Sequence, residues 1–355
     1  MVEKEAPIRE TILFETLDRG AVRCGICPHR CEIAPGASGI CSTRKNIGGK
    51  LYSVIYGLIS SVAIDPIEKK PLFHFHPGSR CLSLGSYGCN LQCIHCQNWS
   101  IAHVRPSIDE RAGEFLSPLQ SIRLAQEERV DGLCWTYNEP TIWLEYMIES
   151  AQLARQGGFY TAVVTNGYIT PEALALLAPN VDAYRVDLKG WNPSFWRKIA
   201  NISDPKPIFE AARLARKSWN LHVEVVTNVI PTYNDDDATF HQLAGWIRES
   251  LGPETPWHVT RFIPYLALSH LPATPLSTLE HARQIGLEEG LEYVYLGNVP
   301  THPAENTLCP RCGSLLIERS GYRILRNTLK QRNQCPRCHL AIPIVGASFS
   351  TMALL

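Results

Sequence analysis

The chain has 355 residues, with 34 Lys and Arg against 34 Asp and Glu and a hydrophobic share of 45%. This is enough for one large domain with smaller modules and a substantial core. Balanced charge argues against a nucleic-acid partner or an acidic membrane surface, since both favour a basic face. We expect no membrane span, because no apolar run approaches ~20 residues, and no secretory signal, because the first residues lack an apolar segment.

Cysteine is the most informative residue type. Eleven of the thirteen cysteines fall into three tight clusters, a spacing typical of metal ligands rather than of the disulfides of a secreted protein. The other two, Cys81 and Cys134, lie in apolar runs and are expected to be buried. We therefore expect a cytoplasmic protein with an oxygen-sensitive metal site.

The first module, residues 1–77, holds four cysteines within 18 residues among prolines and glycines: Cys24, Cys27, Cys31 and Cys41. This pattern predicts a small loop closed by a metal. Zinc is the plainest choice, and an iron–sulfur cluster or four unligated thiols are the alternatives. His29 could replace one thiolate, although we expect a surface histidine. Later in the module, the β-branched and aromatic residues of Leu51–Tyr56 predict a strand.

From residue 78 to 300, short apolar runs alternate with helical stretches, which predicts a parallel β/α sheet in the form of a partial barrel. Ser117-Pro118 and Thr170-Pro171 supply N-caps and first-turn prolines for helices over 118–129 and 171–177. An open doubly wound sheet is the second choice, disfavoured because no glycine-rich fingerprint follows the first strand. The expected strands are Cys81–Leu84, Gly132–Thr136, Thr161–Thr165, Ala183–Leu188, His222–Val229, His258–Phe262 and Glu292–Leu296.

Three cysteines follow the first of these strands at the spacing Cys-x3-Cys-x2-Cys: Cys89, Cys93 and Cys96. Four cysteines would close a tetrahedral site. Three thiolates can instead hold three irons of a [4Fe-4S] cluster and leave the fourth iron open to a substrate or cofactor. Loops at the carboxyl ends of barrel strands carry active sites. A zinc knuckle or a chance grouping is the alternative.

The string Gly-Cys-Asn-Leu-x-Cys-x-x-Cys-Gln-Asn-Trp over residues 88–99 resembles the cluster loop of the radical S-adenosylmethionine (SAM) superfamily. More narrowly, it resembles the AmmeMemoRadiSam-system enzymes, relatives of the pyruvate formate-lyase activating enzymes. The resemblance implies a partial (β/α)6 TIM-like barrel, here with one added strand. It also implies a [4Fe-4S] cluster that reductively cleaves SAM to a 5′-deoxyadenosyl radical for hydrogen abstraction. A flavodoxin or ferredoxin is the electron donor that this chemistry implies.

Polar residues follow the next two strands. Glu139 ends the second strand region, where a carboxylate can hold an ammonium group, and the resemblance assigns Glu139 and Asn138 to the amino group of SAM. Relatives often have glycines at Tyr137 and Asn138, so the backbone path differs here. A simple helix start is the alternative role for this segment. After the third strand, the resemblance assigns Thr165 and Asn166 to the ribose or a nearby cation.

The fourth strand ends in Asp187 and Lys189, which would face the same side. They could bind the cofactor, a peptide or a monovalent cation, or they could form an ion pair with each other. After the fifth strand, Asn228 is in line with a SAM-contacting position of the family.

Two positions depart from the family pattern. His95 stands where relatives often carry an aromatic residue against adenine, and its imidazole could still stack there. Ile263 stands where relatives commonly have a histidine, and it cannot donate a hydrogen bond. His258 is a candidate to supply the missing contact.

The last module, residues 301–355, contains two Cys-x2-Cys knuckles, formed by Cys309, Cys312, Cys335 and Cys338. This is the signature of a zinc-ribbon or rubredoxin-like module, holding structural zinc or iron. So short a segment buries too little surface to fold dependably alone, so the metal would decide its stability.

Together these features predict a radical SAM enzyme with an unidentified substrate. A glycyl-radical enzyme activase acting on a protein glycine is one alternative. The resemblance also suggests Memo-like or AMMECR-type partner proteins. A non-catalytic metal-binding adaptor is the alternative from a different class, and the polar residues at the strand ends disfavour it.

Overall fold

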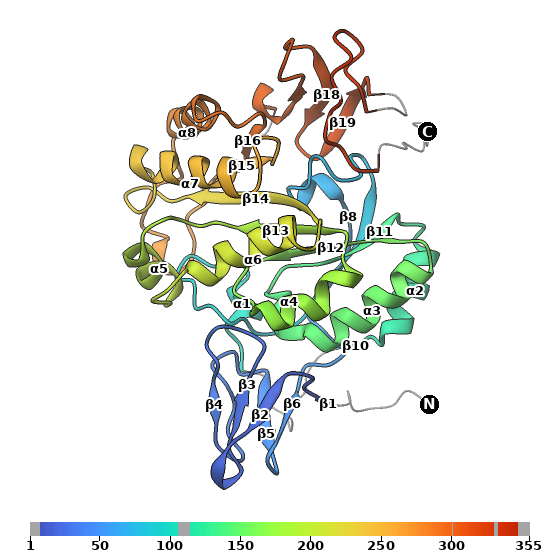
Figure 1. Cartoon of the computed structure of the whole chain (residues 1–355), viewed down its shortest axis with the longest axis vertical. Helices are drawn as coiled ribbons and strands as arrows, with labels where there is room; N and C mark the ends of the chain where they lie inside the picture. Colours follow the sequence, from blue (N-terminus) through green and yellow to red (C-terminus); the bar gives the residue numbers. More distant parts are fainter. Residues whose placement is uncertain (1–7, 106–113, 300, 330–332, 347–355) are drawn as a thin grey trace.

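The computed structural model describes residues 8–105, 114–299, 301–329 and 333–346. At its centre is one eight-stranded sheet with the strand order β16-β15-β14-β13-β12-β11-β9-β8 (Figure 1). All neighbouring pairs from β9 to β16 are parallel, and β8 pairs antiparallel with β9. The strands are β8 (Ser61–Pro66), β9 (Arg80–Gly85), β11 (Gly132–Trp135), β12 (Tyr160–Thr165), β13 (Ala183–Asp187), β14 (His222–Val229), β15 (Trp257–Arg261) and β16 (Val294–Gly297).

The seven parallel strands coincide with the seven predicted runs to within two residues at each end. The eighth strand was missed. β8 lies in the segment assigned to the N-terminal module, so the central sheet begins before the predicted boundary at residue 78. The predicted strand Leu51–Tyr56 is present in part, as β6 (Lys50–Ser53), which belongs to a small separate sheet.

The strand order along the parallel part follows the chain and never reverses. A doubly wound sheet requires such a reversal, so this second choice does not describe the fold. Right-handed crossovers between successive neighbours place every connecting helix on the same face. Closure of this sheet into a partial barrel stays a prediction. The helices after β10 are α2 (Pro118–Glu127), α3 (Leu144–Gln156), α4 (Pro171–Leu177), α5 (Pro193–Ala200), α6 (Lys206–Lys217), α7 (Asp237–Ser250) and α8 (Leu276–Glu288).

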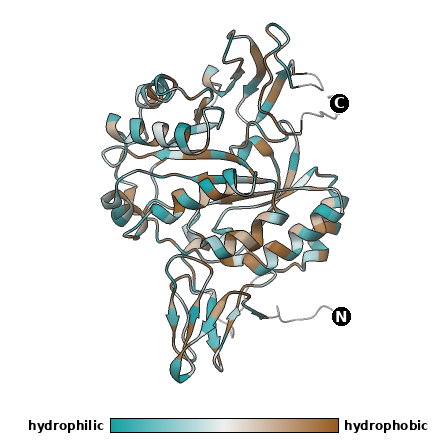
Figure 2. Cartoon of the chain, viewed as in Figure 1, coloured by the Kyte–Doolittle hydropathy of each residue, from teal (hydrophilic) through white to brown (hydrophobic). Residues whose placement is uncertain are grey.

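The helices form one continuous layer. Contacts join α2 to α3, α3 to α4, α4 to α6 and α7 to α8. The rings of Phe209 on α6 and Trp246 on α7 meet at 4.9 Å and connect the two groups. Each helix is apolar toward the sheet and polar outward, visible as brown and teal stretches of the same ribbon (Figure 2).

Both predicted helix starts are confirmed. The Ser117 side chain accepts from the backbone N–H of Gln120 at 3.2 Å, and the Gln120 side chain accepts from the backbone of Ser117 at 2.8 Å, which completes a capping box. Thr170 likewise caps α4 through the N–H of Ala173. These caps fix where the crossover helices begin and so where the preceding loops end.

The terminal modules extend from different ends of the central domain (Figure 1). Near the N-terminus lie two small antiparallel sheets and a two-stranded ribbon. The last module has a three-stranded sheet, β17 (Thr307–Leu308), β18 (Leu315–Ser320) and β19 (Arg323–Asn327). The earlier strands and the short helix after the cluster loop are β1 (Arg9–Glu10), β2 (Phe14–Thr16), β3 (Val22–Cys24), β4 (Glu32–Ile33), β5 (Arg44–Ile47), β7 (Leu58–Ile59), α1 (Trp99–Ala102) and β10 (Glu114–Phe115).

The N-terminal sheets share the core of the central domain, and a buried ion pair locks them to α3. Arg44 donates to Glu145 Oε1 at 2.7 Å, to Thr11 Oγ1 at 2.9 Å and to the carbonyl of Ile142 at 2.9 Å. Both charged side chains are at most 3% exposed. Burial opposes the charge on Arg44, but Glu145 outweighs burial and raises the Arg44 pKa.

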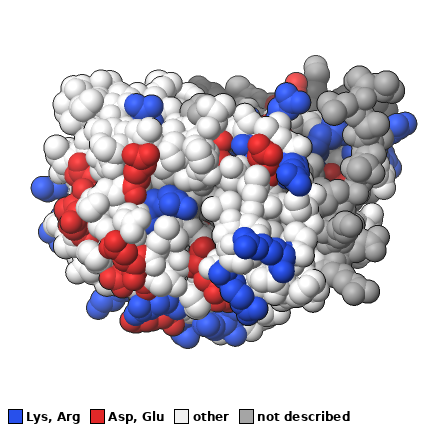
Figure 3. Space-filling view, turned by 90° about the horizontal axis from the view of Figure 1, so that it is seen from above, with Lys and Arg blue, Asp and Glu red and all other residues white. Residues whose placement is uncertain are grey.

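Among the described helices, none combines the length and the apolar character that crossing a membrane requires. The face seen in Figure 3 carries acidic and basic side chains interspersed, in keeping with the zero net charge.

We expect Arg44→Met to lower the free energy of unfolding by roughly 3–5 kcal/mol, because it leaves the Glu145 carboxylate buried without its partner. Adding Glu145→Leu should recover much of that loss. The control is Arg9→Ala, which breaks an exposed pair with Glu149 and should cost no more than ~1 kcal/mol. Urea denaturation followed by tryptophan fluorescence measures all three. Equal costs for the buried and the exposed pair would contradict the role given to Arg44.

Candidate active site

A cavity of about 470 Å³ opens at the carboxyl ends of the parallel strands. Every residue that the sequence analysis assigned to the cluster loop, or to a cofactor contact at a strand end, lines this cavity. The lining includes Cys89, Cys93, His95, Cys96, Asn138, Glu139, Thr165, Asn166, Asp187, Lys189 and Asn228. These residues come from five segments between positions 89 and 228, and the parallel order of the sheet is what gathers them.

The three loop cysteines are largely withdrawn from water. Burial raises the pKa of Cys93 to about 11 and raises those of Cys89 and Cys96. Their thiolates therefore need a positive group to be stable. A single zinc ion would hold its sulfurs about 3.8 Å apart, given Zn–S bonds of ~2.3 Å. Within the described residues, such a close grouping occurs at the C-terminal cysteines and not at these three. A cubane cluster binds each thiolate through a different iron, which spreads the sulfurs apart.

The start of the cluster loop is held by Asn138. Its Oδ1 accepts from the N–H of Ser86 at 3.0 Å, and its Nδ2 donates to the carbonyl of Gly88 at 3.0 Å. The Asn138 side chain therefore positions the loop, and its assignment to SAM stays a prediction.

Glu139 joins two strand ends. Its Oε1 accepts from the N–H of Thr141 at 2.9 Å and from Thr165 Oγ1 at 2.6 Å, and its Oε2 accepts from the N–H of Asn166 at 2.7 Å. The contact with Thr141 caps the short helix Pro140–Trp143, so the helix-start role is present. Burial is the strongest influence on Glu139 and raises its pKa against these three donors. Oε2 retains capacity for one further donor.

Asn166 reaches the cluster loop itself. Its Nδ2 donates to Asn90 Oδ1 at 2.9 Å and lies 3.7 Å from Cys89 Sγ, while its Oδ1 accepts from the N–H of Tyr168 at 2.8 Å. The backbone N–H of Leu91 also points at Cys89 Sγ, at 3.3 Å. The resemblance assigned Asn166 to the ribose or a cation, whereas its described contacts are with the first cluster cysteine and its neighbour.

Asp187 and Lys189 form the ion pair that was one of their two predicted roles. Lys189 Nζ lies 2.6 Å from Asp187 Oδ2, and Arg185 pairs with Oδ1. Burial would raise the Asp187 pKa, but the two cations outweigh it and lower the pKa. Lys189 also lowers the pKa of Cys93 through its charge, although burial dominates there. Arg185 was missed, and the period-two spacing Arg185-x-Asp187-x-Lys189 was the signal that could have found it.

Glu68 Oε2 in the cavity lining is buried without a hydrogen-bond partner, and the same holds for one atom of each of two predicted site residues, His95 Nδ1 and Asn228 Oδ1. Burial, with help from the charge of Lys189, lowers the His95 pKa to about 3, so the ring is neutral. Buried polar atoms without partners are uncommon in folded proteins. His95 Nδ1 and Asn228 Oδ1 are therefore available to a bound molecule.

Ile263 is 48% exposed and does not line the cavity. His258 does line it, but its Nε2 is bonded to Glu224 Oε2 at 2.7 Å. Glu224 also accepts from His222 at 2.8 Å and from the backbone N–H groups of Phe73 and His74. His258 is thus part of a buried network, and its role as a substitute for the family histidine stays a prediction.

The sequence did not indicate that both flanking modules reach the cavity. Lys70 lines it and pairs with Asp65 at 2.6 Å, and Asp65 also accepts from the hydroxyl of Tyr137 at 2.8 Å. From the last module, Glu305, Gly321 and Tyr322 line it too. The lining thus joins Lys70 to Tyr322, far apart in the chain, and such contacts leave no periodic signal in the sequence.

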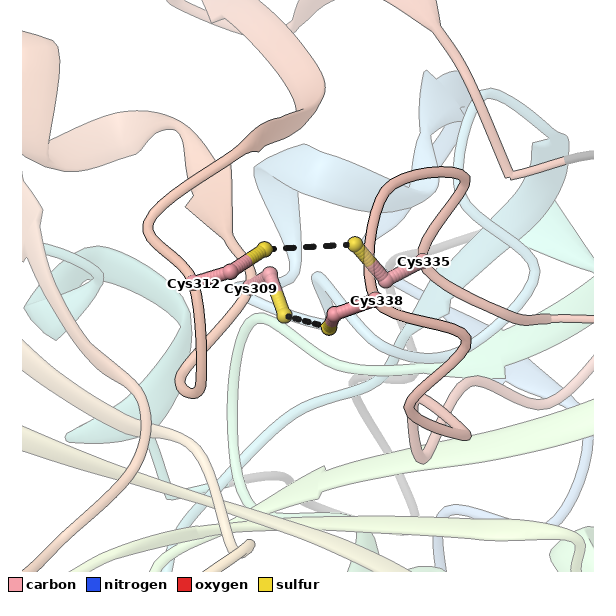
Figure 4. Close-up of side chains that lie close together, drawn as sticks. All are labelled: Cys309, Cys312, Cys335 and Cys338. Atoms are coloured by element: carbon pink, nitrogen blue, oxygen red, sulfur yellow. Dashed lines mark hydrogen bonds between the residues drawn. The ribbon is translucent and has the colours of Figure 1, made fainter.

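The C-terminal cysteines form a metal-binding group. Cys309 Sγ lies 3.5 Å from Cys338 Sγ, and Cys312 Sγ lies 3.6 Å from Cys335 Sγ (Figure 4). All four sulfurs lie within 4.8 Å of one another. This is the geometry of a tetrahedral four-thiolate site for a single ion, which zinc and iron can both occupy.

Comparison with known proteins agrees with this geometry. A family model described as the Radical SAM superfamily matches residues 84–244, which span the cluster loop and the strand ends around the cavity. The chain therefore contains a radical SAM domain. It is 44% identical over 341 residues to the uncharacterized protein MJ0808 of Methanocaldococcus jannaschii, a match that covers 95% of this chain and all of that protein.

More distant radical SAM relatives include an activating enzyme. The pyruvate formate-lyase 1-activating enzyme of Escherichia coli K12 is 21% identical over 175 residues, covering 49% of this chain and 70% of that enzyme. A solved radical SAM methyltransferase from Sphaerobacter thermophilus superposes with a TM-score of 0.48 at 17% identity, over 68% of this chain and 71% of that one. A radical SAM domain with an activating-enzyme homologue makes this chain an enzyme rather than a non-catalytic adaptor.

We expect Cys335→Ser to lose the C-terminal metal and to expose hairpin β18–β19 to protease, because structural zinc contributes apparent binding energies of roughly 10–16 kcal/mol in small fingers. Cys335→His is the matched control, since imidazole is also a zinc ligand and should retain part of the metal. Metal analysis and limited proteolysis measure both effects. Unchanged metal content and protease resistance in the serine variant would contradict the site.

Proposed function

We propose that this radical SAM enzyme holds a [4Fe-4S] cluster through Cys89, Cys93 and Cys96 and cleaves SAM in the cavity beside it. When bound, the cluster and SAM supply reductive cleavage to methionine and a 5′-deoxyadenosyl radical that abstracts hydrogen. The observation that supports this most directly is the shared cavity, in which three cysteines and the polar strand ends surround one space. Its volume of about 470 Å³ is of the order that small-molecule and cofactor sites occupy.

The chain's own residues have distinct tasks in this proposal. The remaining acceptor capacity of Glu139 Oε2 suits the ammonium group of SAM, whose positive charge would offset the burial that raises the Glu139 pKa. Asn228 Oδ1, which lacks a partner, accepts a hydroxyl of the ribose. The neutral ring of His95 stacks on the adenine without adding charge near the sulfonium.

Two groups tune the cluster site. Asn166 Nδ2 at 3.7 Å and the N–H of Leu91 at 3.3 Å approach Cys89 Sγ, and donors to cluster sulfurs help set the reduction potential. Lys189 places a cation near Cys93. Asn138 and Asn166 keep the loop rigid, so that the reacting groups are held in place and water is excluded.

The substrate is a separate question, and two classes remain. The E. coli relative is named for the activation of pyruvate formate-lyase, which favours a protein glycine as the target and a flavodoxin or ferredoxin as electron donor. A small-molecule target is the other class. Membership of the AmmeMemoRadiSam system, with Memo-like or AMMECR-type partners, rests on the resemblance of the loop alone.

The deciding experiment is anaerobic reconstitution with iron and sulfide, followed by reduction and assay for 5′-deoxyadenosine from SAM. We expect product from the wild type and none from Cys93→Ala, because removal of a ligand thiolate destroys the cluster. Cys134→Ala is the matched control: this buried β11 cysteine is outside all three ligand sets, and its variant should retain product formation. Absence of product from correctly reconstituted wild type would refute the proposal.

Asn228→Ala is expected to weaken SAM binding by about tenfold, or ~1.4 kcal/mol, if its Oδ1 accepts a SAM hydroxyl. Anaerobic calorimetry measures this. Asn180→Ala removes an amide that contacts only the carbonyl of Leu176, away from the cavity, and should leave the affinity unchanged. Equal affinities for both variants would remove Asn228 from the cofactor site.

Deuterium transfer separates the two substrate classes. Non-exchangeable, carbon-bound deuterium placed on a candidate protein or small molecule should appear in 5′-deoxyadenosine only for the true hydrogen donor. Deuterium uptake from a peptide segment would favour the activase role, and uptake from a small molecule would exclude it.

A further inference from the structure

The four N-terminal cysteines surround a second, small cavity. It is lined by Cys24, Cys27, Cys31 and Cys41, together with His29 and a shell of apolar side chains. The cysteines come from β3, from the turn after it and from the loop before β5. All four are free thiols, although they lie close enough to influence one another's ionisation.

The two four-cysteine sets of this chain differ in geometry. At the C-terminal set, all four sulfurs lie within 4.8 Å of one another, as a single ion requires. The N-terminal set forms no such group, although all its members are described residues. Four thiols that line one cavity without forming such a close group fit a polynuclear iron–sulfur cluster, in which each thiolate binds its own iron. The same comparison argues against zinc.

The surroundings fit a low-dielectric redox centre. Ile26 and Ile33 are buried against the cavity. Arg44, fixed by Glu145, also lines it, and its charge lowers the pKa of Cys24, although burial dominates and raises that pKa to about 11. A buried cation beside the thiols offsets part of the negative charge of a cluster held by four thiolates.

This second site lies directly against the cluster loop. His29 Nε2 donates to the carbonyl of Asn90 at 2.8 Å, so His29 is not the free surface histidine that we expected. A Cβ on Gly88 would lie 3.0 Å from the carbonyl of Cys41 and 2.6 Å from the side chain of Thr43. Asn90 in turn contacts Asn166, whose amide approaches Cys89 Sγ. Gly88 alone thus stands between Cys41 and Cys89 at one contact, and at the other His29 touches the residue that follows Cys89.

The N-terminal site is partly open to solvent, as is the loop site, whose three cysteines are also half-buried. The half-buried Cys31 and Cys41 flank Ile40, which is 53% exposed. Cys24 and Cys27 are buried on the inner side. The N-terminal site thus has an edge near solvent, where a protein electron donor can approach without entering the SAM cavity.

We propose that Cys24, Cys27, Cys31 and Cys41 hold a second iron–sulfur cluster that relays electrons to the cluster at Cys89, Cys93 and Cys96. A reduced flavodoxin or ferredoxin donates one electron to the N-terminal cluster, which becomes reduced while the donor becomes oxidised. That electron then passes to the neighbouring cluster, and the N-terminal cluster returns to its oxidised state. Binding of the second cluster is independent of the proposed function, whereas the relay rests on it.

The binding claim is tested in the triple variant Cys89→Ala/Cys93→Ala/Cys96→Ala, which leaves the N-terminal site intact. After anaerobic reconstitution, it should retain roughly half of the wild-type cluster iron, with a Mössbauer signal that SAM does not perturb. Zinc without iron in this variant, or no metal at the N-terminal thiols, would overturn the second cluster. Neither outcome depends on whether the wild type cleaves SAM.

The relay claim is tested in Cys31→Ser/Cys41→Ser, with Cys134→Ala as the control that loses a thiol outside all three ligand sets. With reduced flavodoxin as donor, the double variant should make far less 5′-deoxyadenosine than wild type. With dithionite, which is small enough to reach the loop cluster directly, the double variant should remain active. Circular dichroism and retained iron at Cys89 establish that it is folded. Equal rates with flavodoxin in the double variant and in the control would refute the relay and leave the proposed function standing.

Discussion

The close approach of Gly88 to the N-terminal module is the constraint on which the cluster loop depends. Gly88 has φ 85°, a conformation that glycine adopts freely and other residues rarely do. Its missing Cβ would overlap Thr43 at 2.6 Å. The residue directly before Cys89 can therefore lie against the preceding module only as glycine. Asn138 then fixes its carbonyl, so the direction in which Cys89 leaves the strand is set from two sides.

At the three loop cysteines, burial and nearby positive charge have opposite effects on the stability of the thiolates, and their balance favours metal binding. Desolvation raises the pKa of all three loop thiols, so thiolates would be unstable there without cations. Lys189 supplies part of the positive charge, and Asp187 with Arg185 holds Lys189 in place. A bound metal supplies the rest, and metal binding releases the thiol protons. Loading of the site should thus become easier as pH rises.

Much of the fold was predictable because its signals are local. The seven parallel strands follow from apolar runs, and two helices begin where Ser117 and Thr170 supply caps. Spacing alone divided eleven cysteines into three sets, and the C-terminal set of four does form a metal-binding group; the ligand roles of the other seven stay predictions. Edge strand β8 was missed, since Ser61–Pro66 is only partly buried and ends in proline. The role of a site residue was harder to predict from the sequence than its position in the fold. Asn138 and Glu139 do reach the cavity, but their bonds to Ser86, Thr141 and Thr165 depend on how distant strand ends meet.

The C-terminal cysteine group is linked to one wall of the cavity at the strand ends. It closes the loops around hairpin β18–β19, and the turn of that hairpin brings Gly321 and Tyr322 to the cavity lining. Arg319, at the end of β18, donates to the carbonyl of Phe73 at 2.9 Å and lies over the Phe73 ring at 4.3 Å. Loss of the metal would free this hairpin before it disturbed the sheet. One wall of the active site, rather than the cluster, would then be the first feature to change.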